Sequence, residues 1–295
     1  MRIGALVLQT RPWDDFAAVC RQVERFGFDV IYVGDHLTHP AVPGRWLADG
    51  WTLLAAAATV TDRLELGTLV SSTAIRHPVP LARAAATVND ISGGRVVLGL
   101  GAGTAHDAAA DRGEALPLGR LSSRFAQTVE ALAALWDGAS EWRGDEAGFS
   151  GLQTLPLPPG TPRPFLMLAA HGPRGFDLVA RHADGWNTIG GTAWSGGLDA
   201  EQYWSLLRRQ ATDVGAACER QGRDVAQVRR SLLLGFGPVR PGDDVRGYVE
   251  AAERASEAGF DELVLPWPDG KPGDPFWAQT ATFEQAVSAI RSALG

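Results

Sequence analysis

The stretch Ile91-Ser92-Gly93-Gly94-Arg95-Val96-Val97-Leu98-Gly99-Leu100-Gly101 carries the pattern that decides the fold. An amphipathic segment ends in a polar, glycine-rich turn, and a run of apolar residues follows the turn at once. Glycine supplies the left-handed backbone that commonly ends a helix. A nearly continuous apolar run is typical of a parallel strand that is buried on both faces. The stretch therefore predicts a helix, a tight turn and a buried parallel strand.

The same unit recurs along the chain. Phe26-Gly27-Phe28-Asp29, His182-Ala183-Asp184-Gly185 and Ala258-Gly259-Phe260-Asp261 are similar turns that lead into apolar runs. The expected strands are Ile3–Leu8, Val30–Val33, Leu64–Val70, Val96–Gly101, Phe165–Ala169, Gly185–Ile189, Leu232–Phe236 and Glu262–Leu265. The expected helices are Trp13–Phe26, Trp51–Thr61, Val79–Ile91, Leu121–Trp136, Arg174–His182, Glu201–Gln221, Asp243–Ala258 and Thr282–Leu294.

Alternating strands and helices with right-handed crossovers predict an α/β protein with a parallel sheet, and eight such units close a (β/α)8 TIM barrel. An open, doubly wound sheet is the structural alternative. The segment Asp137–Pro164 lacks a helical period, and we interpret it as an insertion between the fourth helix and the fifth strand, with a short hairpin. No stretch resembles a linker, so one domain is expected over residues 1–295.

Composition narrows the classes of protein. The 295 residues are 45% hydrophobic, with a net charge of -7, so a sizeable core is expected and nucleic-acid binding is disfavoured. The two cysteines, Cys20 and Cys218, exclude a disulfide framework and suit a reducing cytoplasm. The run Ile3–Leu8 meets Arg11-Pro12 without a signal-peptide pattern, and no stretch is long enough to cross a membrane. We therefore expect a cytoplasmic protein.

In such a barrel, ligands bind at the carboxyl ends of the strands. Asp35-His36 is the acid–base pair at one of these ends, where His36 can exchange a proton or contact a reacting ring. The structural alternative, a turn-capping Asp35 with a neutral packed His36, is equally open. His39 suggests a metal site with this pair, but the further ligands that zinc requires are missing, so no metal is predicted.

Two glycine-rich turns also lie at expected strand ends. Gly99-Leu100-Gly101-Ala102-Gly103 departs from the dinucleotide fingerprint because residue 104 is Thr, and it indicates close approach of the backbone to a flat group or tight packing. His171-Gly172-Pro173-Arg174-Gly175 opens a helix, whose amides and dipole favour an anion, with Arg174 as a charge partner. An ordinary strand-to-helix turn is the alternative.

Taken together, these motifs resemble the bacterial luciferase-like superfamily of flavin- and deazaflavin-dependent oxidoreductases. The matching segments run in family order over most of the chain: Gly27-Phe28-Asp29, Gly34-Asp35-His36, Leu66-Gly67-Thr68-Leu69-Val70, Arg76-His77-Pro78, Ile91–Gly103, Ala169-Ala170-His171-Gly172-Pro173-Arg174 and Ala183-Asp184-Gly185-Trp186-Asn187. The Asp-His pair and the Ala-Ala-x-Gly-Pro-Arg segment are most similar to the branch that uses coenzyme F420.

The resemblance implies a barrel that binds the cofactor ring across the carboxyl ends of its strands. By this resemblance, His36 sits against the ring and is the catalytic residue, with Asp35 helping to hold it. Leu69-Val70 matches a non-proline cis peptide that buttresses the ring. The remaining residues that match cofactor-binding positions are Ser71, Ala102, Gly103, Asp107, Ala170, His171, Gly172, Pro173 and Arg174.

One departure affects the expected mechanism. Some deazaflavin-dependent sugar-phosphate dehydrogenases of the superfamily carry a glutamate general acid where this chain has Thr104. That difference argues against their substrate and leaves His36 as the recognisable proton-handling group.

These features predict an oxidoreductase that transfers a hydride between coenzyme F420 and a small organic substrate. The alternatives are a monooxygenase that uses reduced FMN and oxygen, and a catalytically silent flavin-binding barrel. The loops Leu37–Gly50, Asp137–Pro164, Gly190–Leu198 and Pro266–Phe276 are expected to shape an apolar or aromatic substrate pocket. By resemblance, the protein is expected to form a homodimer.

Overall fold

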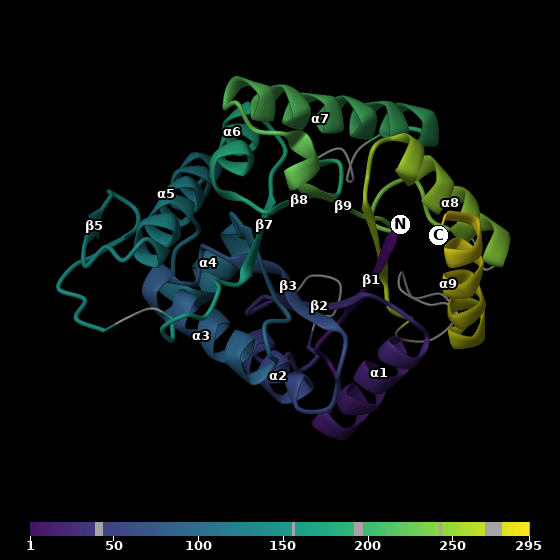
Figure 1. Cartoon of the computed structure of the whole chain (residues 1–295), viewed down its shortest axis with the longest axis horizontal. Coiled ribbons are helices and arrows are strands. Elements are labelled where there is room, and N and C mark those ends of the chain that lie inside the picture. The colour runs from purple at the N-terminus through teal and green to yellow at the C-terminus, as the bar shows by residue number, and fades with distance from the viewer. Residues whose placement is uncertain (39–43, 155–156, 192–196, 242–243, 269–278, 295) are drawn as a thin grey trace. The chain divides into compact units, whose positions relative to one another are not determined.

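The computed structural model describes residues 1–38, 44–154, 157–191, 197–241, 244–268 and 279–294 (Figure 1). The strands are β1 (Arg2–Val7), β2 (Val30–Asp35), β3 (Glu65–Ser72), β4 (Val96–Gly101), β5 (Trp142–Arg143), β6 (Gly148–Phe149), β7 (Phe165–Ala169), β8 (Gly185–Thr188), β9 (Arg229–Leu233) and β10 (Glu262–Pro266). The helices are α1 (Trp13–Arg25), α2 (Gly50–Ala58), α3 (Pro78–Ile91), α4 (Ala105–Arg112), α5 (Leu118–Trp136), α6 (Pro173–His182), α7 (Ala200–Arg220), α8 (Val245–Glu257) and α9 (Thr280–Leu294), with a short 3-10 helix η2 (Val225–Gln227).

Eight parallel strands form a closed barrel in the order β1-β10-β9-β8-β7-β4-β3-β2. Register pairs such as Gly4 with Val264 and Leu98 with Leu166 are parallel. Both β2 and β4 are buried along their whole length, as strands covered on two faces must be. The expected (β/α)8 barrel is therefore confirmed.

The chain divides into two compact units. The first comprises Met1–Leu8, Ala18–Tyr32 and Ala170–Gly295, and the second comprises Gln9–Ala17 and Val33–Ala169. The single domain expected over residues 1–295 stays a prediction.

Aromatic side chains fill part of the core of the first unit. The Phe283 ring of α9 stacks on Phe28 with centroids 6.0 Å apart and meets the edges of Tyr248 and Trp267 at 5.3 and 5.7 Å. All four side chains are buried, so this cluster fixes α9 against the strands of its unit.

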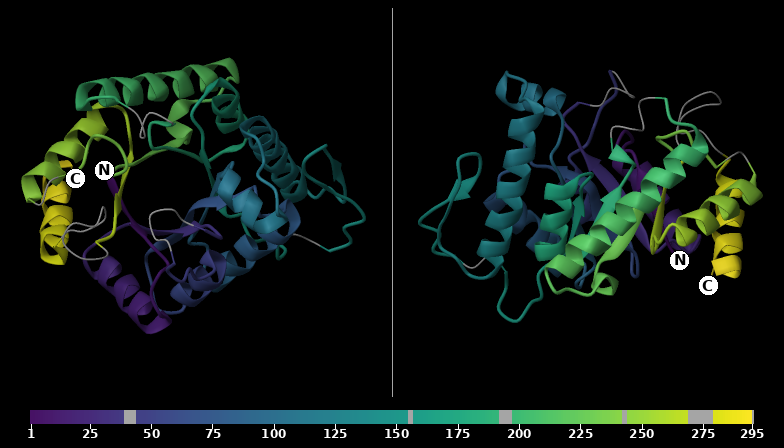
Figure 2. Two further views of the ribbon diagram at one scale, coloured as in Figure 1. Left: turned by 180° about the vertical axis from the view of Figure 1, so that it is seen from behind. Right: turned by 90° about the horizontal axis from the view of Figure 1, so that it is seen from above.

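Helices of the first unit pack in neighbouring pairs. Helix α6 lies beside α7, and α8 lies beside α9 (Figures 1 and 2). The N-terminal amine of Met1 donates to the carbonyl oxygen of Leu294 at 3.3 Å, so both ends of the described chain meet in this unit.

The second unit contains the insertion. Strands β5 and β6 pair antiparallel, Trp142 with Phe149, and form the expected short hairpin beside α5 (Figure 2). The hairpin is anchored by Arg124 of α5, whose buried guanidinium donates to the carbonyl oxygens of Thr73 and Glu146 at 2.5 and 2.7 Å.

Two local details differ from the sequence interpretation. Helix α4 was not expected, because its alanine-rich sequence has no apolar period; Thr104 starts it by accepting a hydrogen bond from the Asp107 amide. Strand β9 begins at Arg229 rather than at Leu232, because Arg229 and Arg230 pair with Glu262 and Asp261 at that end.

In the described part of the chain, we find no helix that is both long and apolar enough to cross a membrane.

Candidate functional site

His36 and Asp107 form a hydrogen-bonded pair in the second unit. His36 directly follows β2, and Asp107 lies in the first turn of α4. The Nδ1 atom of His36 lies 2.8 Å from Oδ2 of Asp107. The Asp107 side chain is fully buried, whereas the His36 side chain keeps a 25% exposed surface. Asp107 therefore fixes Nδ1 of the imidazole, while part of the His36 side chain is exposed to solvent.

The Asp107 carboxylate is surrounded by donors. Its Oδ1 accepts hydrogen bonds from the amides of Leu37 and Thr38 at 2.9 and 3.3 Å, and its Oδ2 accepts one from the Thr104 hydroxyl at 2.8 Å. Burial alone would raise the pKa of Asp107, but the hydrogen bonds from His36, Thr104 and Leu37 together lower it. Asp107 is therefore an ionised acceptor, and Nδ1 of His36 carries the proton between them.

Thr104 positions this pair. Its hydroxyl oxygen accepts from the Asp107 amide at 3.0 Å, which caps α4, and its proton is donated to the Asp107 carboxylate. A glutamate at this position would have been a candidate general acid. Thr104 instead fixes the acid that holds His36.

Asp35 pairs with Arg76 and not with the adjacent His36. Its carboxylate accepts two hydrogen bonds from Arg76, at 3.0 and 2.6 Å, and Arg76 also contacts Oδ1 of Asp49 at 2.5 Å. The hydrogen bond to Asp35 raises the pKa of Arg76. Burial would raise the pKa of Asp49, but its hydrogen bond with Arg76 helps to lower it. Asp49 caps α2, so this cluster ties the end of β2 to the starts of α2 and α3.

The peptide bond between Leu69 and Val70 is cis, as the resemblance implied. Glycines of β4 pack directly against this part of β3. A Cβ atom on Gly99 would overlap the carbonyl oxygen of Thr68, and one on Gly101 would overlap the Val70 side chain. Tight packing, one of the two interpretations of the glycine run, is therefore the reason for these two glycines.

The serines after the cis bond are buried. The Ser71 hydroxyl accepts from the Trp51 indole at 3.0 Å and donates to Thr68 at 3.1 Å. The Ser72 hydroxyl is buried without a hydrogen-bond partner in the described structure, and a Cβ atom on Gly103 would overlap it. Gly103 itself adopts a φ of 77°, which glycine tolerates.

The turn Ala170–Arg174 lies in the first unit and opens α6. Gly172 is the N-cap, no side chain caps the helix, and Pro173 occupies the first turn. A Cβ atom on Gly172 would meet nothing within 4 Å, whereas one on Gly175 would lie 2.7 Å from the Ala170 side chain. The helix start is thus packed on one side and open on the other, with its first amides uncapped.

His171 in this turn has neutral partners. Its Nδ1 lies 3.2 Å from the Thr188 hydroxyl, which in turn donates to the side-chain oxygen of Gln210 at 2.8 Å. The residue as a whole is exposed, yet the protein around the ring removes enough water that desolvation lowers the pKa of His171.

The predicted site residues thus fall into two groups. The second unit contains Asp35, His36, Leu69, Val70, Ser71, Ala102, Gly103 and Asp107; the first contains Ala170, His171, Gly172, Pro173 and Arg174. Their convergence around one ring stays a prediction. His39 lies outside the described residues, as do parts of the loops Leu37–Gly50, Asp137–Pro164, Gly190–Leu198 and Pro266–Phe276. No group of three or more His, Cys, Asp or Glu side chains in the described ranges is arranged to hold a metal ion.

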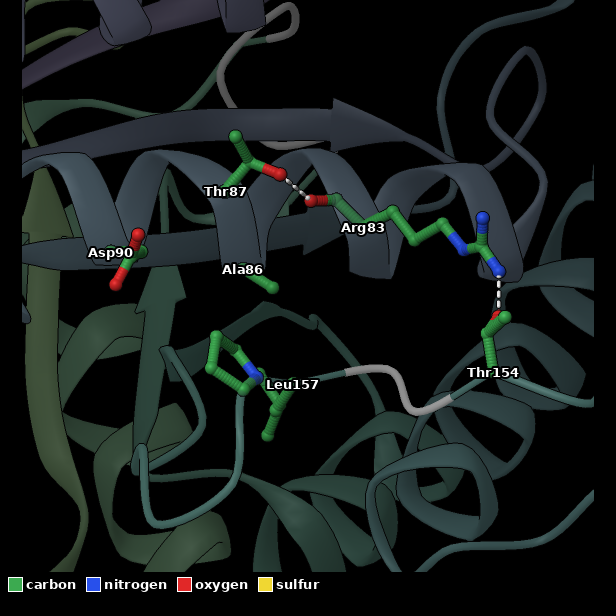
Figure 3. A pocket seen from close by; sticks show the side chains of 7 residues that line it. Arg83, Ala86, Thr87, Asp90, Thr154 and Leu157 are labelled. Carbon is green, nitrogen blue, oxygen red and sulfur yellow. Dashed lines mark hydrogen bonds between the residues drawn. The ribbon is translucent and has the colours of Figure 1, made fainter.

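A pocket of about 410 Å³ lies in the second unit between α3 and the C-terminal part of the insertion. It is lined by Arg83, Ala86, Thr87, Asp90, Thr154, Leu157 and Pro158, and Arg83 reaches across to the Thr154 hydroxyl (Figure 3). None of the predicted site residues lines it.

Sequence reasoning missed three partners. Arg76, which binds Asp35, was named only within a segment that matches the family, and Thr188 and Gln210 were not singled out. Each contact spans a long stretch of sequence: 41 residues separate Arg76 from Asp35, and 22 separate Gln210 from Thr188. A single sequence carries no direct signal for such pairs.

The chain is an α/β barrel in which a histidine at the end of β2, His36, is hydrogen-bonded to the carboxylate of Asp107. Comparison with known proteins agrees: the model of the luciferase-like monooxygenase family matches residues 1–235. The chain belongs to this family and is a luciferase-like oxidoreductase.

The chain is also similar in sequence to individual proteins. An uncharacterised protein of Mycobacterium tuberculosis is 32% identical over 267 residues, covering 79% of this chain and 91% of that protein. A phthiodiolone/phenolphthiodiolone dimycocerosates ketoreductase of the same organism is 29% identical over 252 residues, covering 76% of this chain and 61% of the relative.

Solved structures share the fold. An F420-dependent secondary alcohol dehydrogenase in complex with an F420-acetone adduct has a TM-score of 0.80 at 20% identity, covering 98% of this chain and 99% of that chain. A riboflavin lyase with modified FMN has a TM-score of 0.72 at 16% identity, covering 99% of this chain and 92% of that chain. Similar folds therefore bind either cofactor.

Proposed function

We propose that this luciferase-like oxidoreductase transfers a hydride between coenzyme F420 and a small apolar or aromatic organic substrate. The observation that carries the proposal is the His36–Asp107 pair, a proton-handling group at the end of β2. The names of two similar proteins support it: one is an F420-dependent secondary alcohol dehydrogenase, and the other is a ketoreductase.

The described residues fit such a cofactor. The uncapped start of α6 and the open space at Gly172 suit an anionic tail, because amides at a helix N-terminus favour negative charge. The cis peptide at Leu69-Val70 and the partly exposed His36 imidazole would face its ring. When bound, coenzyme F420 supplies the hydride chemistry, and the chain supplies binding and proton management.

His36 would hold and move the proton. Since Nδ1 is directed at Asp107, Nε2 is the nitrogen that exchanges a proton with the substrate oxygen. The Asp107 carboxylate fixes the proton on Nδ1, so Nε2 can give a proton to a carbonyl oxygen that is being reduced or accept one from an alcohol. Asp107 acts through His36 and is a positioning residue.

FMN-dependent monooxygenation is the second candidate. It is favoured by membership of the luciferase-like monooxygenase family and by the similarity to a riboflavin lyase with modified FMN. A catalytically silent flavin-binding barrel is a third possibility. An anion-binding turn would serve the phosphate of either cofactor, so that turn does not separate them.

Binding and turnover separate these functions. Fluorescence titration of the purified protein with coenzyme F420 and, separately, FMN is expected to show tight binding of F420. Tight FMN binding without F420 binding would reject the proposal in favour of the second candidate. Binding without turnover over a panel of ketones and alcohols would favour the silent barrel. Size-exclusion chromatography tests the homodimer that completes the proposal.

A further inference from the structure

His171 is the second histidine of the predicted site, and its surroundings determine which of its nitrogens carries the proton. The relevant residues all lie in the first unit: His171 after β7, Thr188 at the end of β8, and Gln210 on α7. Thr188 is fully buried and Gln210 is 6% exposed, so water does not compete with their hydrogen bonds.

The hydrogen bonds form a one-way chain. The Thr188 hydroxyl has one proton, which it donates to Oε1 of Gln210 at 2.8 Å. Its oxygen accepts from the Gly190 amide at 2.9 Å, and Nδ1 of His171 lies 3.2 Å away. Because the hydroxyl proton is already committed, Thr188 can only accept from His171. Nδ1 of His171 therefore carries a proton, and in a neutral ring Nε2 carries a lone pair.

The backbone around the ring is shaped to leave room for it. Gly190 and Gly191 adopt φ values of 84° and 67°, where other residues are strained. A Cβ atom on Gly191 would lie 3.2 Å from Cβ of His171, and one on Gly190 would overlap the ring of Tyr203. Tyr203 is itself anchored by a hydrogen bond to the Ile189 carbonyl oxygen at 3.0 Å.

No described residue forms a hydrogen bond with Nε2 of His171, although the residue is exposed. An accessible lone pair whose orientation is fixed requires a donor. A phosphodiester or a phosphate dianion has no proton to donate, and its oxygens would face that lone pair unfavourably. A ligand group with a proton to donate, such as a hydroxyl group, fits this lone pair.

We propose that His171 is a neutral hydrogen-bond acceptor for a ligand hydroxyl group, rather than a ligand of the cofactor phosphate. This inference rests on the proposed function for the identity of the ligand. The hydroxyl belongs either to the polyol chain of the coenzyme or to an alcohol substrate. The anionic tail is left to the amides of α6 and to Arg174.

The first test is the tautomer in the cofactor-free protein. Nitrogen-15 NMR of histidine-labelled protein at pH 8, with the resonance assigned by His171→Gln, is expected to show a protonated Nδ1 and an unprotonated Nε2. Thr188→Ser keeps the acceptor and should leave this pattern unchanged. Thr188→Val removes the acceptor and should release the ring toward the Nε2–H tautomer. An Nε2–H tautomer in the unaltered protein would overturn the inference.

The second test uses ligands and the same resonances. Saturating coenzyme F420, or FMN if only FMN binds, is expected to shift the Nε2 signal while the ring stays neutral if the coenzyme provides the hydroxyl. A shift that appears only after propan-2-ol is added assigns the hydroxyl to the substrate. Conversion of the ring to imidazolium, or no shift in either complex, would overturn the inference while leaving cofactor binding intact.

The third test does not depend on any cofactor. Titration of the cofactor-free protein with inorganic phosphate should leave His171 neutral, whereas glycerol should shift its Nε2 signal and should do so less in Thr188→Val. Protonation of the ring by phosphate would overturn the inference. If a coenzyme hydroxyl is the partner, His171→Gln should weaken coenzyme binding about tenfold, the effect of one lost hydrogen bond.

Discussion

His36 and His171 each follow a strand of the barrel, and each uses Nδ1 to bond the protein, yet their partners differ in kind. Nδ1 of His36 lies 2.8 Å from the Asp107 carboxylate. Nδ1 of His171 contacts the Thr188 hydroxyl, which donates its own proton to Gln210. A carboxylate places a negative charge beside the imidazole, whereas a hydroxyl places none. The same side chain is thereby suited to proton donation in one unit and to hydrogen-bond acceptance in the other.

The two surroundings also differ in charge. Around His36, ionised groups form the framework, because Arg76 bridges Asp35 and Asp49 close to the end of β2. Around His171, the framework consists of a hydroxyl, an amide side chain and two glycines. Changes that alter charge should therefore act on the second unit most, and changes that alter shape or desolvation should act on the first.

The largest expected effect is on catalysis. Asp107→Asn and His36→Asn should each lower kcat/KM by about 100-fold or more, because both remove the same proton-holding pair. The double variant should lose little more than either single variant, since the two residues act as one unit. Steady-state kinetics with the cofactor that binds is the measurement.

His106→Asn is the matched control for this prediction. His106 is exposed and lies next to Asp107 on α4. Its replacement should leave kcat/KM unchanged. Fully additive losses in the double variant would contradict the pairing of His36 with Asp107.

The next effect is on stability. Arg76→Met leaves Asp35 buried without its cation and should lower the free energy of unfolding by about 3 kcal/mol, measured by urea denaturation. Arg76→Met with Asp35→Asn should recover part of that loss, because no isolated charge is left. Arg246→Met is the control: its pair with Glu250 is exposed to solvent, so little or no stability should be lost. Equal losses at both arginines would contradict the bracing role of Arg76.

A smaller effect is expected at Thr104. Thr104→Val removes the cap of α4 and one donor to Asp107, and should cost about 1 kcal/mol of unfolding free energy. Thr104→Ser keeps the hydroxyl and should be close to neutral. If the serine variant lost as much as the valine variant, the hydroxyl would not be the stabilising group.

The smallest effect is the pH dependence that distinguishes the two sites. The pKa of His171 is lowered from its usual 6.5 by desolvation, so the folded chain binds fewer protons there than the unfolded chain. That contribution to stability is complete above pH 6.5 and is lost as the pH falls through the folded pKa. For Asp107 the pKa is lowered from 3.8, so its contribution persists to a lower pH and is lost only below that value.

Urea denaturation between pH 8 and pH 3 measures both losses. His171→Gln should remove the part of the decline that begins below pH 6.5, and Asp107→Asn the part that begins below pH 3.8. A decline near pH 6.5 that is unchanged in His171→Gln would show that another group causes it.

The barrel could be predicted from the sequence because its determinants are local. Each helix, glycine turn and apolar run lies within one short stretch, as Ile91–Gly101 illustrates, and the repeat of that unit predicts closure. Helix α4 was missed because its start depends on one threonine cap rather than on a periodic pattern.

The site was predicted less completely because its contacts are not local. The sequence pointed to His36, and the resemblance pointed to Asp107 and to the cis bond at Leu69-Val70, but the hydrogen bond that joins His36 to Asp107 crosses 71 residues of chain. The adjacent Asp35 was the natural partner to expect. Its preference for Arg76 follows from how β2, α2 and α3 come together, which is a property of the folded chain.

The Thr104 hydroxyl caps the eight-residue helix α4 and also holds the Asp107 carboxylate that bonds the His36 imidazole. Short helices fray at their ends under conditions that leave a protein's core intact. Each time the first turn of α4 opens, the acid behind His36 is displaced, so the chemistry should fade at a lower temperature than the one that melts the barrel. The working temperature range of the enzyme would then be set by a single helical turn.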